Sequence, residues 1–193
     1  MSEPKGGSSV HEGLRAEKQR IRQETRLISE KLAPEYRQEA SREIARQVLE
    51  HPLWKQARTV MMYSSLPGEP DTRFLMEKAL QEGKTLLLPR CLEAGRMEAL
   101  PVKDPGKLAP GSLGIPEPAP AEDGTRIPEP DLVLVPCVAA APNGTRLGHG
   151  AGYYDRFLAE HSAKTICLCF RKLLRSDLPA EGTDIFMDYV ISD

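Results

Sequence analysis

Residues 131–170 read DLVLVPCVAAAPNGTRLGHGAGYYDRFLAEHSAKTICLCF. This stretch begins and ends on short, nearly continuous apolar runs, Asp131–Pro136 and Lys164–Phe170, which have the length and composition of buried β-strands. Between the two runs lie a glycine-rich turn and a helix-compatible segment, YYDRFLAEHS. Parallel strands need a crossover of this kind, because a tight hairpin can join only antiparallel strands. We therefore expect a parallel strand pair here.

The same strand, helix, strand order occurs earlier in the chain. Arg58–Ser65 and Lys84–Arg90 are two further apolar runs, and DTRFLMEKALQEG lies between them. In that segment Asp71 is a good N-cap and Gly83 is a good C-terminal stop, which predicts a helix. Unbroken apolar strands alternating with helices indicate an α/β protein with three layers, α/β/α, and a mostly parallel central sheet.

Two amphipathic helices are expected before the first of these strands. Apolar residues recur at helical spacing over Glu12–Leu32 and Glu35–Glu50. The second helix should end at His51–Pro52, because proline disfavours helix in the residue before it. We expect residues 1–11 to be a disordered lead. A chain of 193 residues has the size of one domain, so residues 1–193 are expected to form a single one.

A proline-rich segment separates the two halves of the predicted sheet. Eight of the 17 prolines lie between Pro101 and Pro130, which predicts an extended excursion over the surface. A linker between two domains is the alternative. It is less favoured, because the apolar strands on either side need one another to complete one sheet.

Composition excludes several classes of protein. Hydrophobic residues make up 40% of the chain, and no apolar run approaches the roughly 20 residues that cross a bilayer. A formal net charge of −2 argues against a dedicated nucleic-acid binder. The four cysteines form no CxxC pair, and the first residues carry no export signal. These features predict reduced thiols in a cytoplasmic protein.

The glycine-rich turn is the most informative motif. PNGTRLGHGAGYYDRFL, residues 142–158, places four glycines directly before the predicted helix. Glycines let an anion approach the backbone amides, and the helix start adds free N–H groups. A tight crossover turn is the plain alternative, but Arg146 offers a permanent charge to phosphate and Asp155 offers an oxygen ligand to Mg²⁺. The spacing fits neither a Walker loop nor a dinucleotide fingerprint.

The segment GTRLGHGAGYYDRFL resembles the signature of the 5-formyltetrahydrofolate cyclo-ligase family, also called methenyltetrahydrofolate synthetases. The resemblance covers nearly the whole chain, and its other parts occur in the family's order. These parts are Lys18 and Arg22 on the first helix, YSSLPGEPDT, GKTLLLPR, LGIPEP and TDIFMDYVIS.

The resemblance implies a NagB/RpiA/CoA-transferase-like fold and a specific reaction. That reaction is the ATP- and Mg²⁺-dependent cyclisation of 5-formyltetrahydrofolate to 5,10-methenyltetrahydrofolate. In the family mechanism, ATP phosphorylates the formyl oxygen, the ring then closes, and ADP and phosphate are released.

The resemblance also implies which residues form the site. The nucleotide contacts fall on Lys18, Arg22, Arg146, Leu147, Gly148, His149, Gly150, Ala151, Gly152, Tyr153 and Tyr154. The folate contacts fall on Ser64, Glu69, Gly150, Gly152 and Tyr154. The metal ligands fall on Asp155 and Asp188, and Arg146 and Tyr154 are expected to act in catalysis.

Several of these residues also have a plainer interpretation. Lys18 and Arg22 are four residues apart, so they share a helical face that could be solvated. Glu69 could be a solvated loop acid, and Asp184 is expected to serve only in a turn. The chain also departs from the family at RKLLRS, residues 171–176, where many members carry a glutamine, which leaves folate recognition there less secure.

Two functions stay open on the sequence. The first is a monomeric cytoplasmic enzyme that binds 5-formyltetrahydrofolate, ATP and Mg²⁺, with no nucleic-acid or membrane partner. The second is a non-catalytic relative that binds nucleotide or folate, against which the retained charged residues Lys18, Arg22, Arg146 and Asp155 argue. A sugar-phosphate isomerase or coenzyme A transferase would need its own catalytic carboxylate loop, and we find none in the sequence.

Overall fold

The first helix of the protein is longer than the sequence pattern predicts. The computed structural model describes residues 7–111, 114–122 and 124–193. Its first helix, α1, spans Gly7–Glu30. The expected disordered lead is therefore wrong from Gly7 onward, because these residues extend the helix by more than a turn. Residues 1–6 lie outside the described residues.

Six strands form the central sheet, in the order β10-β9-β6-β1-β2-β3. Their bounds are β1 Thr59–Met61, β2 Thr85–Cys91, β3 Met97–Pro101, β6 Leu132–Pro136, β9 Lys164–Leu168 and β10 Tyr189–Ile191. All neighbours are parallel except β2 and β3, which pair antiparallel with Leu88 opposite Leu100. The predicted mostly parallel sheet is confirmed, and each of the four predicted strands is present. β3 and β10 lie at the two edges of the sheet, beyond these four strands.

Four shorter helices complete the main elements. They are α2 Pro34–Glu50, α3 Pro52–Gln56, α4 Arg73–Gln81 and α5 Tyr153–Glu160. The expected break at His51–Pro52 is confirmed, because it separates α2 from α3. The expected N-cap of α4 is wrong by one residue: Thr72 is the N-cap, and Asp71 instead accepts a hydrogen bond of 2.9 Å from the backbone N–H of Arg73.

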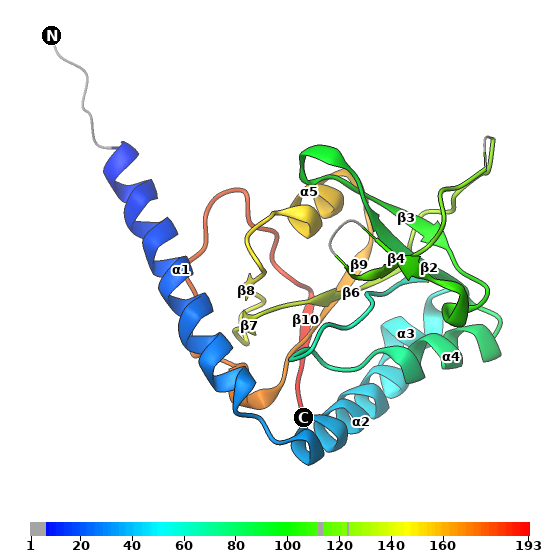
Figure 1. Ribbon diagram of the computed structural model, residues 1–193, viewed down its shortest axis with the longest axis horizontal. Coiled ribbons are helices and arrows are strands. Elements are labelled where there is room, and N and C mark those ends of the chain that lie inside the picture. The colour runs from blue at the N-terminus through cyan, green and yellow to red at the C-terminus, as the bar shows by residue number, and fades with distance from the viewer. Residues whose placement is uncertain (1–6, 112–113, 123) are drawn as a thin grey trace, which may run out of the picture.

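The two crossovers run in opposite directions along the sheet. β1 connects through α4 to β2, whereas β6 connects through α5 to β9. Crossovers of this kind are right-handed, which places α4 and α5 on opposite faces. Figure 1 shows α5 on one side of the strands and α2, α3 and α4 on the other, so the sheet is the middle layer. The reversal between β1 and β6 opens a crevice at their carboxyl ends, where α/β proteins bind ligands.

The core lies on both faces of this sheet. Leu132, Val133, Leu134 and Val135 of β6 are completely buried. A strand covered by helices on both faces needs apolar residues at every position, which explains the continuous runs in the sequence. All four cysteines are free thiols, and only Cys91 is partly exposed.

The proline-rich segment after β3 stays close to the sheet. It contains a 3₁₀ turn, Pro105–Lys107, and a small antiparallel pair formed by β4 Ala109–Pro110 and β5 Pro116–Glu117. The hydroxyl of Ser64, just after β1, donates a hydrogen bond of 2.9 Å to the carbonyl of Pro116. This bond brings the excursion to the carboxyl end of the sheet.

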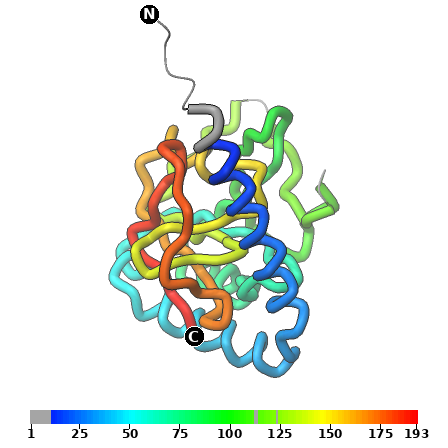
Figure 2. Tube along the Cα trace, turned by 90° about the vertical axis from the view of Figure 1, so that its left-hand side faces the viewer, coloured from blue at the N-terminus to red at the C-terminus, as the bar shows by residue number. Residues whose placement is uncertain are grey.

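Helix α1 lies along one side of the molecule, next to the hairpin of β7 Ala139–Ala140 and β8 Arg146–Leu147 (Figures 1 and 2). Ile21 is 3% exposed and belongs to a small apolar cluster with the hairpin residues Ala139 and Leu147. This packing directs the neighbouring part of α1 toward the glycine-rich turn. In the described ranges, no helix is long and apolar enough to cross a membrane.

Candidate active site

A cavity of about 1130 Å³ opens at the carboxyl ends of β1, β2 and β6. Ser64, Cys91 and Pro136 line it where these three strands end. The middle of α1, the glycine-rich turn and residues 181–185 form the other sides. The cavity therefore occupies the crevice that the topology predicts, and chain segments far apart in sequence meet there.

The glycine-rich turn connects β8 to α5 along one side of the cavity. Gly150 and Gly152 have φ angles of +104° and +71°, in the region that favours glycine. A Cβ on Gly152 would lie 2.8 Å from a terminal nitrogen of Arg156. The hydrogen bonds among the described residues use none of the N–H groups of Gly150, Ala151 and Gly152. These amides, next to the start of α5, remain available to an anion.

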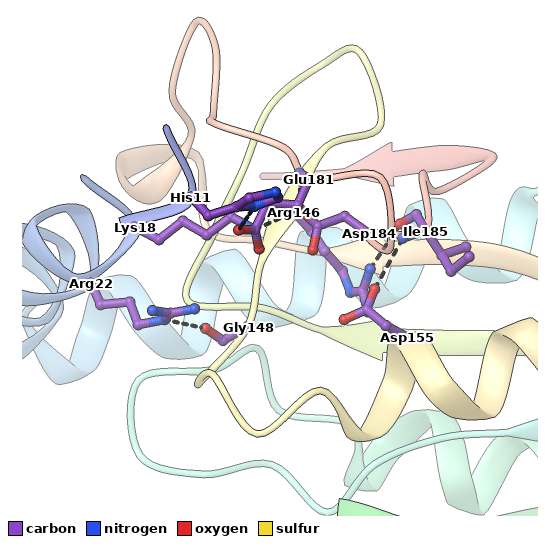
Figure 3. A network of polar contacts seen from close by, with 9 residues as sticks. All are labelled: His11, Lys18, Arg22, Arg146, Gly148, Asp155, Glu181, Asp184 and Ile185. Carbon is purple, nitrogen blue, oxygen red and sulfur yellow. Dashed lines mark hydrogen bonds and ion pairs between the residues drawn. The ribbon is translucent and has the colours of Figure 1, made fainter. Parts of the chain in front are cut away.

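Arg146 and Asp155 form an ion pair at the base of the turn (Figure 3). The Arg146 side chain is 5% exposed, and its Nη2 donates to Oδ1 of Asp155 at 3.0 Å. Its Nη1 donates to the carbonyl of Ile185 at 2.8 Å, and the N–H of Ile185 donates to the same Asp155 oxygen at 3.0 Å. The pair thus joins the turn, α5 and the C-terminal segment into one unit.

Lys18 points from α1 into the cavity and contacts two carboxylates (Figure 3). Its Nζ lies 2.7 Å from Oδ2 of Asp184 and 3.0 Å from Oε2 of Glu181. Burial opposes its positive charge, but the hydrogen bonds to Asp184 and Glu181 outweigh burial and raise the pKa of Lys18 above its ordinary value. The solvated-face interpretation is therefore wrong for Lys18, which is a buried ammonium ion.

Arg22, one helical turn further along α1, contacts the glycine-rich turn itself. Its Nε donates a hydrogen bond of 2.8 Å to the carbonyl of Gly148. A Cβ on Gly150 would lie 3.4 Å from the central carbon of its guanidinium group. The structure thus brings both predicted cations of α1 to the cavity that the predicted phosphate-binding turn lines.

Glu181 and Asp184 are the acids that the sequence reasoning underestimated. Oδ2 of Asp184 accepts the N–H of Glu181 at 2.7 Å, which is the turn chemistry expected of it. The same oxygen also accepts a hydrogen bond from Nζ of Lys18. Glu181 was not predicted to be a site residue. TDIFMDYVIS starts two residues beyond Glu181, so that segment was the available signal for this part of the site.

The predicted metal ligand Asp188 lies elsewhere, so its pairing with Asp155 is wrong. Asp188 precedes β10, which runs parallel to β9, and this places it at the amino-terminal edge of the sheet, opposite the cavity. Its oxygens accept hydrogen bonds of 2.9 Å from Nζ of Lys164 and from the N–H and hydroxyl of Thr165. Burial opposes the charge of Asp188, but these bonds outweigh it and lower its pKa.

The remaining acids at the cavity fit a Mg²⁺ ion held largely by phosphate. In the described residues, no group of three His, Cys, Asp or Glu side chains is placed to hold a metal. Mg²⁺ in nucleotide enzymes is usually bound by one or two carboxylates together with substrate phosphates, so such a group is not required. Asp155 is the suitable carboxylate, because it lines the cavity and its hydrogen bonds with the described residues engage only Oδ1.

Glu69 lines the cavity from the loop after β1. Its side chain is 6% exposed, so the solvated-acid interpretation is wrong. Oε2 accepts the N–H of Leu66 at 2.9 Å, and Oε1 lies 3.1 Å from Nε2 of His149 in the glycine-rich turn. Glu69 thus connects two loops that carry predicted ligand contacts. Ser64 also lines the cavity, although its hydroxyl is used by Pro116.

Tyr154 carries a polar atom that lacks a partner. Its hydroxyl oxygen is buried and makes no hydrogen bond within the described part of the chain. Burial, and next the negative charge of Glu69, raise the pKa of Tyr154, so the phenol stays protonated at neutral pH. A buried hydroxyl without a partner costs free energy, and a ligand in the cavity that accepts its hydrogen bond would remove that cost.

Fold and site together define a class of protein: a doubly wound α/β protein with an anion-binding glycine loop at the switch point of its sheet. A sequence model of the 5-formyltetrahydrofolate cyclo-ligase family matches residues 14–193. The chain therefore belongs to the 5-formyltetrahydrofolate cyclo-ligase family, as the signature in residues 144–158 indicated.

Individual relatives agree with this assignment. A probable 5-formyltetrahydrofolate cyclo-ligase of Caenorhabditis elegans is 31% identical over 189 residues, which cover 90% of this chain and 91% of the relative. The 5-formyltetrahydrofolate cyclo-ligase of Escherichia coli K12 is 31% identical over 178 residues, covering 89% and 96%.

Solved structures agree on the fold. The 5,10-methenyltetrahydrofolate synthetase of Aquifex aeolicus matches with a TM-score of 0.78 and 30% identity, covering 90% of this chain and 88% of that one. The 5,10-methenyltetrahydrofolate synthetase of Mycoplasma pneumoniae matches with a TM-score of 0.72, covering 91% and 98%; at 18% identity it supports the fold alone.

Proposed function

We propose that this chain catalyses the ATP-dependent cyclisation of 5-formyltetrahydrofolate to 5,10-methenyltetrahydrofolate, with release of ADP and phosphate. The observation that carries the proposal is the composition of one cavity. Unbonded amides and two cations line one side, and a buried carboxylate, Glu69, and an unpartnered phenol, Tyr154, line another. The amides and cations suit the phosphates of a nucleoside triphosphate. Glu69 and Tyr154 suit a polar heterocycle bound beside it.

The reaction explains why these groups are needed. A formyl group on nitrogen is an amide, whose oxygen is a poor leaving group. In the proposed reaction this oxygen attacks the γ-phosphorus of ATP, and the bond from that phosphorus to ADP breaks. The second folate nitrogen then attacks the formyl carbon and loses its proton, and the carbon–oxygen bond breaks as phosphate leaves. Phosphoryl transfer chiefly needs positioning and charge neutralisation.

The chain's own residues divide this work. Lys18, Arg22 and the amides of residues 150–152 bind the phosphates, and the Arg146–Asp155 pair holds the turn in position. Tyr154 donates its proton in a hydrogen bond to the formyl or transferred phosphoryl oxygen. Asp155 would hold Mg²⁺ together with the phosphates; that ion supplies further charge neutralisation when bound.

Lys18 must exchange partners when ATP binds. Its ammonium group now contacts Asp184 and Glu181, and triphosphate oxygens are stronger competitors for it than either carboxylate alone.

We further propose that the enzyme acts as a monomer in the cytoplasm. The four free thiols support a reducing compartment, and the net charge of −2 supports the absence of a nucleic-acid partner.

An absorbance assay tests the function. Product formation is followed on adding 5-formyltetrahydrofolate and MgATP to the purified chain, with ADP measured in parallel. We expect equal amounts of methenyl product and ADP. Arg22→Gln should raise KM for ATP roughly 10-fold or more, since a charged hydrogen bond is lost. Arg20→Gln is the matched control, because Arg20 pairs with Glu17 and Glu24 on the exposed side of α1.

The same assay distinguishes this function from that of a non-catalytic relative. A wild-type chain that binds 5-formyltetrahydrofolate and MgATP but forms no methenyl product would be the non-catalytic relative instead. Equal effects of Arg22→Gln and Arg20→Gln on KM for ATP would contradict the assigned phosphate-binding face of α1.

A further inference from the structure

Glu117 in β5 is a buried acid to which the proposed reaction gives no role. The residue is 6% exposed. Within the described part of the chain, its Oε1 is fully buried and has no hydrogen-bond partner. A buried carboxylate with an unpaired oxygen is costly in free energy, and proteins retain such groups mainly where a ligand completes them.

The fold holds this carboxylate in a fixed place. β5 pairs with β4, with Glu117 opposite Ala109. A Cβ on Gly111 would lie 2.1 Å from the carboxylate carbon of Glu117, so the carboxylate packs directly against the backbone of Gly111. Ser64 anchors the preceding residue through its hydrogen bond to the carbonyl of Pro116. The proline-rich excursion is thus built to place one carboxylate beside the end of β2.

Glu117 is a neighbour of residues that line the cavity. Cys91, the last residue of β2, and Tyr153, the first of α5, both line the cavity. Burial, and next a hydrogen bond to Glu117, raise the pKa of Cys91 to about 11, so this neighbour is a neutral thiol. Glu117 and Tyr154, each with a polar atom that lacks a partner in the described residues, therefore lie next to or at the same cavity.

The chemistry of a carboxylate selects between the two proposed substrates. A carboxylate offers only acceptors, so its best partner presents two adjacent N–H donors. The adenine edge of ATP alternates a donor with an acceptor, and the acceptor would face a like partial charge. The 2-amino-4-oxo ring of a reduced pterin presents a ring N–H next to an amino group, which supplies two adjacent donors.

We propose that Glu117 is a specificity-determining residue that accepts hydrogen bonds from the 2-amino and ring N–H groups of the pterin. The inference rests on the proposed function, because it takes the pterin from that substrate. Ser64 then acts as a positioning residue: its hydroxyl holds Pro116, and through it Glu117, rather than the folate. In this arrangement the proline-rich excursion binds the pterin of the folate, and α1 binds the phosphates of ATP.

Binding measurements test this assignment without requiring turnover. The ligands are 5-formyltetrahydrofolate and its analogue with methyl in place of the 2-amino group, titrated into the full chain by calorimetry. The wild type should bind the analogue roughly 10- to 100-fold more weakly. Glu117→Leu should lose roughly the same factor for 5-formyltetrahydrofolate and bind both ligands within about twofold. Affinity for MgADP should be unchanged.

Two further variants separate recognition from folding. Glu117→Gln keeps the size of the side chain, so it should fold with an equal or higher Tm, because an unpaired buried charge is removed. It should nevertheless bind 5-formyltetrahydrofolate roughly 10-fold more weakly. Glu122→Gln is the matched control: Glu122 is an exposed acid in the same excursion, and its change should leave both affinities unaltered.

Each result decides the matter. Full discrimination retained in Glu117→Leu would overturn the assignment of Glu117 and leave the proposed function standing. A lower Tm for Glu117→Gln with unchanged folate affinity would make Glu117 a structural residue and would also overturn it. A wild type that binds folate, discriminates as described and forms no product would support the assignment while contradicting the proposed function.

Discussion

At the scale of single residues, the site is notable for polar atoms that the protein leaves without partners. Buried hydroxyls and carboxylates are normally bonded, because an unmade hydrogen bond in the interior costs more than a made one contributes. Tyr154 and Glu117 depart from this rule beside the same cavity, whereas Tyr63 obeys it by donating to the carbonyl of Pro70 at 3.1 Å. This contrast suggests a matched experiment on two tyrosines.

Tyr154→Phe and Tyr63→Phe should have opposite effects. Removing the unpartnered hydroxyl of Tyr154 should leave the free energy of unfolding unchanged or slightly higher, and lower kcat roughly 10- to 100-fold. Removing the bonded hydroxyl of Tyr63 should lower the free energy of unfolding by about 1 kcal/mol and leave kcat nearly unchanged. Urea unfolding and initial rates measure both. A fully active Tyr154→Phe variant would remove this phenol from the mechanism.

Asp188 should affect stability and not nucleotide binding. Its pKa in the folded protein lies below the ordinary value of 3.8, so its ionised form stabilises the fold above that pH. Asp188→Asn should therefore lower Tm at pH 7 without raising KM for ATP. The difference in Tm from wild type should shrink as the pH falls below 3.8, where Asp188 becomes protonated. A pH-independent difference would contradict the ion pair with Lys164.

The sequence predicted the identity of most site residues but not their contacts. Lys18, Arg22, Arg146 and Asp155 all reach the cavity, as the motif resemblance implied. The choice of Asp188 was wrong because a carboxylate's spacing in the chain does not show on which edge of the sheet it lies. That edge depends on where β10 begins and on its direction, which only the assembled sheet defines.

At the scale of elements, the local patterns were reliable where burial is uniform. Continuous apolar runs predicted β1, β2, β6 and β9, because strands covered on both faces must be apolar throughout. The sequence pattern did not predict β3, because it is a partly buried edge strand that runs into the proline-rich segment. The start of α1 at Gly7 was not predicted, because Val10 is the only apolar residue of its first turn and glycine and serine are weak helix formers.

Gly150 of the glycine-rich turn should be difficult to replace. Its φ of +104° is closed to residues with a Cβ, and an added Cβ would also approach Arg22. Gly150→Ala should lower the free energy of unfolding by about 1–2 kcal/mol and raise KM for ATP roughly 10-fold. Thermal unfolding and initial rates measure these effects.

Gly13→Ala is the control for this substitution. Gly13 lies inside α1 with open space around its Cβ position, so alanine there should raise the free energy of unfolding by about 1 kcal/mol. A Gly150→Ala variant as stable and as tightly ATP-binding as wild type would contradict the role of the turn.

At the scale of the whole molecule, the site exists because the sheet changes direction. β1 leads one way and β6 the other, so their carboxyl ends leave a crevice to which α1, residues 181–185 and the excursion are all attached. These segments lie far apart in the chain, and no local pattern shows that Lys18 will meet Asp184. The alternation of strands and helices made the crevice predictable, but only the tertiary structure identified the partners within it.

An isotope experiment follows the decisive bond directly. 5-Formyltetrahydrofolate labelled with ¹⁸O in its formyl group is converted with MgATP in unlabelled water, and the released phosphate is analysed by mass spectrometry. If the cavity directs the γ-phosphoryl group onto the formyl oxygen, each phosphate formed carries one ¹⁸O atom. Label found in water, with unlabelled phosphate released alongside the methenyl product, would contradict this account.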